Sequence, residues 1–182
     1  MFEHAGQGYC GHGTLCGTLG VSSCLINLVV YDDEFSYLPL VDRMMWWYAQ
    51  MEFPTERFDD ISEFPKQIKA KATTPLCHTS VSKWTLNAGA EVTSHEKKER
   101  CAKVAGEVAF TVVLALNEYF AGDWKPAVWT PSKEITHCIE CHGPESYGRY
   151  TDGMNQQQGH MECLHCHEDH MKTLMNEWPV KD

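Results

Sequence analysis

The five-residue string Cys-x-x-Cys-His occurs twice near the C-terminus of this chain. Two thiols three residues apart can form thioethers with the two vinyl groups of one porphyrin. The histidine that follows then places its imidazole beneath the iron. The pattern therefore predicts two covalent c-type haems, each with one proximal histidine. The residues that would attach and ligate them are Cys138, Cys141, His142, Cys163, Cys166 and His167.

Two Cys-x-x-Cys pairs could instead form the tetrahedral thiolate site of a zinc ribbon. A zinc site has no need of a histidine directly after its second cysteine. Histidine makes up 10 of 182 residues, so both strings would end in histidine by chance in only about 0.3% of cases. The stretch between the strings, residues 142–162, is also slightly long for a ribbon. Haem is favoured over zinc and over disulfides.

The sixth ligand of each iron is less well defined by spacing. Surplus histidines favour low-potential bis-histidine iron, whereas methionine sulfur would raise the reduction potential. A histidine next to its own attachment string cannot reach the opposite haem face. His137 is therefore expected to serve the second haem or a partner subunit, and His160 the first haem. We rank His160 before His137 and His170; the methionine alternatives are Met154, Met161, Met171 and Met175.

Composition limits the partners and the compartment. The 182 residues carry a net charge of −10, which argues against nucleic acid or an anionic membrane as a partner. No apolar run reaches the roughly 18 residues that span a bilayer, so we expect a soluble protein with no membrane span. Haem is attached to such strings outside the cytoplasm, so we expect a periplasmic or otherwise exported protein. Residues 1–4 do not resemble a targeting segment, which we expect to be missing from this sequence.

Hydrophobic periodicity and stop signals predict four helices before the haem strings. They cover about residues 15–30, 36–50, 76–87 and 93–122, with a proline-rich irregular connection at 52–75 that holds at most one short helix. The last helix is the best defined and would be roughly 40 Å long at about 1.5 Å per residue. The predicted fold class is mainly α: a small helical bundle with a C-terminal, loop-rich dihaem-binding segment.

The change in composition predicts a helical cysteine-bearing domain at 1–122 and the dihaem segment at 123–182. Within the first, residues 1–13 are glycine-rich, which indicates either a loop that wraps a bulky group or a flexible N-terminus. A capping-box pattern begins at Thr93. The charged stretch His95–Arg100 that follows is interpreted as a solvated helix end.

With both haem strings behind a cysteine-bearing helical domain, the chain resembles the split-Soret cytochrome c family of anaerobic bacteria. Its N-terminal part is similar to a wider redox family with a spaced C…GCAxxG…C…C pattern. The match departs in having Leu15 and Gly17 where that family usually shows Gly and Ala, and in its extra Cys24. The matching positions are Cys10, the run 16–20, Cys77 and Cys101.

The resemblance implies a homodimer with four haems clustered at one end, and an axial histidine that the neighbouring subunit supplies. It also implies an iron–sulfur cluster on Cys10, Cys16, Cys77 and Cys101, since such clusters are bound by four thiolates. The alternatives are buried thiols that pack as small apolar groups and a disulfide pair. Cys24 lies two turns beyond Cys16 and could replace one of the four ligands.

We expect an electron carrier of anaerobic respiration, because two filled axial positions leave no open iron for a substrate. The alternatives are a haem reductase or peroxidase with one open iron, and a haem redox sensor. From Cys138 to His170 the acidic residues outnumber the basic residues by five. This stretch predicts a redox partner with a basic face.

Overall fold

The computed structural model describes residues 3–32, 34, 36–126, 133 and 136. It divides into two compact units, Met1–Val128 and Trp129–Asp182. Both haem strings and the three candidate distal histidines lie outside the described residues, so their predicted roles stay predictions. The fold below is that of the first unit, which is mainly helical as predicted.

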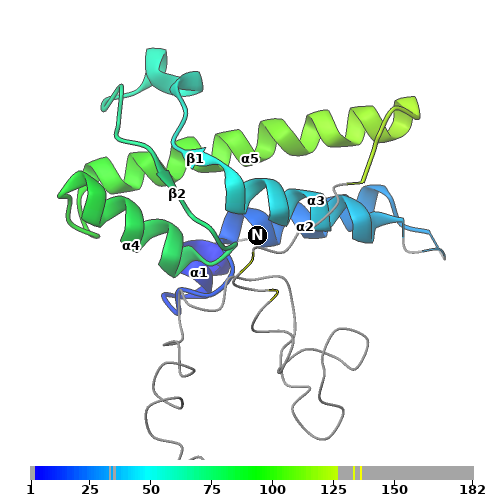
Figure 1. Ribbon diagram of the computed structural model, residues 1–182, viewed down its shortest axis with the longest axis horizontal. Coiled ribbons are helices and arrows are strands. Elements are labelled where there is room, and N and C mark those ends of the chain that lie inside the picture. Colours follow the sequence, from blue (N-terminus) through cyan, green and yellow to red (C-terminus); the bar gives the residue numbers. More distant parts are fainter. Residues whose placement is uncertain (1–2, 33, 35, 127–132, 134–135, 137–182) are drawn as a thin grey trace, which may run out of the picture. The chain divides into compact units, whose positions relative to one another are not determined.

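Each of the four predicted helices is present (Figure 1). They are α2 (Gly17–Val29), α3 (Tyr37–Gln50), α4 (Cys77–Ala88) and α5 (His95–Ala121). Both α4 and α5 end at glycines with positive φ, at 62° for Gly89 and 77° for Gly122. Glycine adopts this left-handed conformation without steric cost, which is why the stop signals in the sequence were informative.

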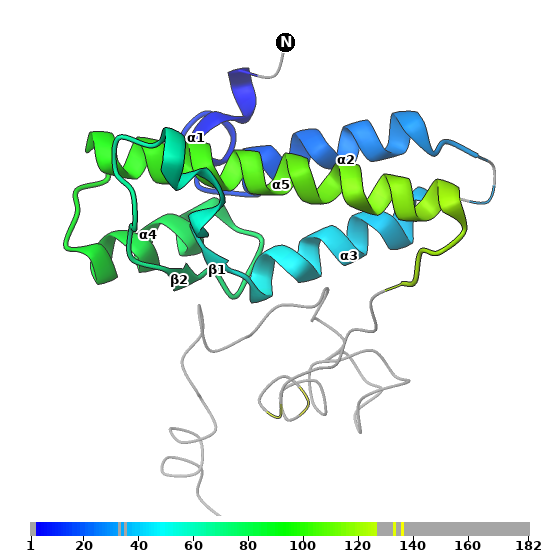
Figure 2. The same cartoon turned by 90° about the horizontal axis from the view of Figure 1, so that it is seen from above.

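The helix α5 runs the length of this unit (Figure 2). Its N-terminal half lies beside α4, and its C-terminal half lies beside α2 and α3, which also pack against each other. Apolar side chains from α2, α3 and α5 form one core. The most buried core members on these three helices are Leu19, Ile26, Leu40, Met44, Tyr48, Val104 and Val108, and Phe53 and Ala72 from the connection between α3 and α4 join them.

The start of α5 corrects one prediction. The N-cap is Ser94, not Thr93, and the Ser94 hydroxyl accepts a hydrogen bond from the Lys97 backbone N–H at 3.2 Å. Two adjacent hydroxyl residues give the same sequence signal. The tertiary path of the chain into the helix decides between them.

By length and composition α5 could also cross a membrane, with a mean hydropathy of 1.4 over its most apolar 18 residues. The apolar runs of the sequence had not predicted a membrane span there. In the structure 28% of that window is buried, and the helix packs against α2 and α3 as the central helix of the bundle.

The connection between α3 and α4 contains more structure than predicted. Strand β1 (Glu52–Phe53) pairs antiparallel with β2 (Ala70–Lys71), and the 3-10 helix η2 (Glu56–Ile61) lies between them. Strands of two residues are too short for an alternating pattern to show in the sequence.

The glycine-rich N-terminus packs closely on the bundle. It forms the 3-10 turn η1 (Glu3–Ala5) and the short helix α1 (Gly6–Tyr9). Gly8 has φ of 66°, and a Cβ there would lie 2.7 Å from the Cβ of Cys77. The glycines of this loop therefore allow it to pack closely against the start of α4; whether it also wraps a bulky group stays a prediction.

Candidate functional site

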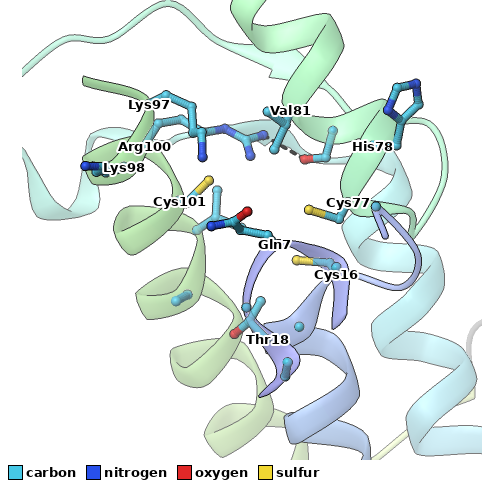
Figure 3. Close-up of a pocket in the computed structure, with 18 of the residues that line it drawn as sticks. Gln7, Cys16, Thr18, Cys77, His78, Val81, Lys97, Lys98, Arg100 and Cys101 are labelled. Atoms are coloured by element: carbon cyan, nitrogen blue, oxygen red, sulfur yellow. Dashed lines mark hydrogen bonds between the residues drawn. The ribbon is translucent and has the colours of Figure 1, made fainter. Parts of the chain in front are cut away.

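A cavity of about 780 Å³ lies where the N-terminal loop meets α2, α4 and α5. This volume is within the roughly 300–1,000 Å³ range of small-molecule sites. Three cysteines line it, and Figure 3 shows their sulfurs reaching toward the same space from three different elements. They are Cys16, Cys77 and Cys101, three of the four residues predicted to bind an iron–sulfur cluster.

Backbone hydrogen bonds position the first two of these thiols. Cys16 is the N-cap of α2, and Cys77 is the first residue of α4. The Cys77 N–H donates to the Thr14 carbonyl at 2.7 Å, and the Cys16 N–H donates to the Pro75 carbonyl at 2.9 Å. The two chain segments thus hold each other in place. The third thiol, Cys101, comes from the second turn of α5.

The fourth predicted ligand, Cys10, is exposed and is not among the residues that line the cavity. Its thiol donates to the His4 carbonyl at 3.5 Å. Its neighbours Gly8 and Gly11 do line the cavity, so Cys10 belongs to a loop at the cavity edge. Spacing indicated the right loop but not the direction of this side chain.

The proposed substitution by Cys24 is wrong. Cys24 is exposed on α2 and does not line the cavity. Eight residues along a helix are about two turns, so Cys16 and Cys24 were expected on one face. They differ because Cys16 is the cap and not a helical residue.

Above the thiols lies a hydrogen-bonded network that the sequence analysis missed. The Ser80 hydroxyl accepts hydrogen bonds from the Tyr48 hydroxyl and from Nη2 of Arg100, each at 2.9 Å. Burial raises the pKa of Tyr48 well above its ordinary value. Arg100 is 2% exposed, and its Nε has no partner among the described residues.

The charge around the cavity is positive. Lys97, Lys98 and Arg100 line it, and none of the described lining residues is aspartate or glutamate. The interpretation of His95–Arg100 as a solvated helix end is therefore wrong at Arg100. A run of charged residues does not indicate which side chain turns inward. The one signal for Arg100 was its position next to Cys101 in the sequence.

Burial raises the pKa of the Cys77 thiol to about 11, and the neighbouring Cys16 and Cys101 add to the rise. Cys77 is thus protonated at neutral pH, and a metal would have to displace its proton. Within the described residues, no three cysteine, histidine, aspartate or glutamate side chains stand close enough to hold a metal ion as they are. The donor set suits iron because soft thiolates converge on one space, although the thiols would have to move closer together.

The fold and the three thiols define a helical domain with a cysteine-lined cavity, followed in the sequence by two Cys-x-x-Cys-His strings. No family model matches the chain. It is 28% identical over 171 residues to the split-Soret cytochrome c of Desulfovibrio desulfuricans. That match covers 92% of this chain and 58% of the relative, so the chain spans less than two thirds of the relative's length.

A solved structure agrees with this match. It was described as "a novel iron centre in the split-Soret cytochrome c" of the same organism, and it matches 98% of this chain and 74% of its own. The TM-score is 0.76 at 24% identity, so the two chains share a fold. The predicted resemblance to the split-Soret cytochromes c is confirmed.

Proposed function

We propose that this protein is an exported dihaem c-type cytochrome that carries single electrons between partners in anaerobic respiration. The observation that carries the proposal is the pair of Cys-x-x-Cys-His strings, found in a chain similar to a split-Soret cytochrome c. The haems supply reversible one-electron chemistry. The polypeptide supplies their thioether anchors and the proximal histidines His142 and His167.

The haem count is tested by mass. The intact protein should exceed the polypeptide by two haems, and acid–acetone should leave both haems on the protein. Cys138→Ser with Cys141→Ser should remove one haem and leave the other in place. A mass equal to the bare chain plus zinc would overturn the proposal.

Carbon monoxide distinguishes the carrier from the alternatives. A bis-histidine iron, with His160 and His137 as the favoured distal ligands, has no free position. The spectrum of the reduced protein should then show no fast change when carbon monoxide is added. A fast shift would favour the reductase, the peroxidase or the haem sensor, in which one iron is open.

We also propose an iron–sulfur cluster in the cavity, bound by Cys16, Cys77 and Cys101, with Cys10 as the fourth ligand. Three of these thiols already converge, and the relative with this fold was described as holding an iron centre. Anaerobic preparations should contain more than two irons per chain, together with acid-labile sulfide. Each substitution Cys16→Ser, Cys77→Ser and Cys101→Ser should remove the extra iron.

Cys24→Ser is the matched control, because Cys24 is exposed on α2 outside the cavity. It should leave the iron content unchanged. Cys10→Ser decides whether the loop supplies the fourth ligand, because it should lower the iron content only if Cys10 turns inward. If careful anaerobic work finds haem iron alone, the three thiols are structural.

The proposed homodimer is supported by apolar side chains that α2 and α5 leave exposed, such as Leu28 at 74% and Phe120 at 65%. Burying such groups between two subunits stabilises the pair by about 25 cal/mol per Å² of apolar area. Analytical ultracentrifugation of the haem-loaded protein should give twice the mass of the chain. Leu28→Glu should shift it toward the monomer.

A further inference from the structure

We propose that the cavity contains a binding site for a small oxyanion, centred on Arg100 and Ser80 and separate in role from the three thiols. The ligand class is a compact molecule or ion with a carboxylate, phosphate or sulfate group. The proposal rests on the cavity and not on the haems or on the iron centre.

The first observation is that two buried hydrogen-bond donors in the cavity are still available, one on Arg100 and one on Ser80. Arg100 is 2% exposed, and its Nε has no partner among the described residues. The Ser80 hydroxyl already accepts two hydrogen bonds, from Tyr48 and from Arg100. A hydroxyl has two acceptor positions and one proton, so Ser80 keeps that proton to donate. Leaving buried donors unpaired is costly, and an oxyanion would pair them.

The second observation is an excess of positively charged side chains at the N-terminal end of α5, where the helix macrodipole is already positive. Lys97 and Lys98 lie in the first turn of α5 and line the cavity with Arg100. Bases in the first turn of a helix are unfavourable, because the macrodipole makes that end positive. The first turn also contains one acidic residue, Glu96, but Glu96 does not line the cavity. In the next turn the Glu99 carboxylate is bound elsewhere, accepting from the Ser62 hydroxyl and the Phe64 N–H. The cavity side is therefore left without a counter-charge among the described residues.

The third observation is geometric. In Figure 3 Arg100 lies across the cavity above the thiols, and its Nη2 donates to the Ser80 hydroxyl. A guanidinium binds carboxylates and phosphates through a planar fork of donors. The cavity volume of about 780 Å³ leaves room for a small molecule beside the thiols.

The competing explanation is that the three cations only offset the negative charge of metal-bound thiolates. That role requires charge but not the donor geometry. Arg100→Lys separates the two, since it keeps the charge and removes the fork.

Equilibrium dialysis of the full-length, haem-loaded protein against radiolabelled sulfate at low ionic strength tests the site. Wild type should bind one sulfate per chain, and unlabelled phosphate or acetate should compete. Arg100→Gln should weaken binding by about tenfold or more, because a buried charge-assisted contact is lost. Arg100→Lys should weaken it nearly as much, and Ser80→Ala several-fold.

Arg43→Gln is the charge-matched control. Arg43 pairs with Glu118 at 2.7 Å, outside the cavity lining, so the variant should bind sulfate as wild type does. Should the Arg100 variants fail to fold by circular dichroism, the double variant Lys97→Gln with Lys98→Gln decides, with an expected loss of at least about threefold.

Two results would overturn the proposal. One is a wild-type protein that binds neither sulfate, phosphate nor acetate. The other is binding that is the same in the folded cavity variants as in Arg43→Gln. Iron content, measured in parallel, shows separately whether the cations serve the thiol centre, and the haem mass tests the proposed function by itself.

Discussion

Lys103 is 4% exposed, and a buried ammonium is tolerated only where its charge is paired. Its Nζ donates to Asp59 Oδ1 at 2.7 Å and to the Phe64 carbonyl at 2.8 Å. Both acceptors belong to the connection between α3 and α4. This one side chain therefore fastens an otherwise irregular segment to α5.

The pairing makes stability depend on pH. The hydrogen bond from Lys103 holds the pKa of Asp59 below its usual range. A carboxyl whose pKa is lowered by folding stabilises the protein above its unfolded pKa of about 3.9, and that contribution is lost as the pH falls through the lowered value. Asp59→Asn should therefore lower the thermal midpoint at pH 7, and the difference from wild type should shrink below about pH 4.

Asp60→Asn is the control for this prediction, since Asp60 is exposed and adjacent. Thermal unfolding followed by circular dichroism at several pH values measures both. A difference between Asp59→Asn and wild type that stays constant down to pH 3 would show that the carboxylate charge is not what matters.

At the scale of elements, only one of two neighbouring hydroxyl residues, Ser94 and not Thr93, caps the N-terminus of α5. Ser94 accepts from the Lys97 N–H and its own hydroxyl donates to the Glu91 carbonyl at 2.7 Å. Ser94→Ala should cost about 1 kcal/mol of unfolding free energy, the usual value of an N-cap. Thr93→Ala, which removes the residue that the sequence pattern favoured, should be nearly neutral in the same urea titration. Equal effects would contradict the cap assignment.

The close packing of the N-terminal loop against α2 gives a second prediction at the scale of elements. A Cβ at Gly17 would clash with the Ala5 carbonyl oxygen, which belongs to the backbone and cannot rotate away. Gly17→Ala should destabilise the protein by about 1–3 kcal/mol, the usual range for overpacking. It should also displace the loop and lower the iron content that the proposed cluster would give.

Gly6→Ala is the matched control, because a Cβ at Gly6 meets nothing within 4 Å. Its stability and iron content should match those of wild type. If Gly17→Ala behaves in the same way, the loop does not hold the close position that the structure gives it.

For the whole molecule, we expect charge to determine how redox partners approach. The stretch from Cys138 to His170 carries an excess of five acidic residues, half of the net −10 of the chain. Because this stretch holds the haem strings, a positively charged mediator should reduce the protein faster at low salt and more slowly as salt rises. The Debye length shrinks to about 8 Å at physiological ionic strength, which screens the attraction.

A negatively charged mediator should show the opposite trend in stopped-flow kinetics. Glu140→Gln with Glu162→Gln should flatten both trends. Rates that do not depend on salt for either mediator would show that the acidic residues do not control access to the haems.

Much of the molecule could be predicted because the signals are local. A haem string needs five consecutive residues, and a helix shows itself through the periodicity of residues such as Val104, Val108 and Val112. The glycines that end α4 and α5 act through their own backbone angles. None of these signals depends on where distant parts of the chain lie.

Only the tertiary structure decided what the cavity contains. Cys16, Cys77 and Cys101 are far apart in sequence, and they meet because three elements pack around one space. Packing also turned Arg100 inward from a charged run and left Cys24 outside. The direction of a side chain depends on the rotation of its helix against its neighbours. That rotation is set by the whole core, and no short stretch of sequence determines it.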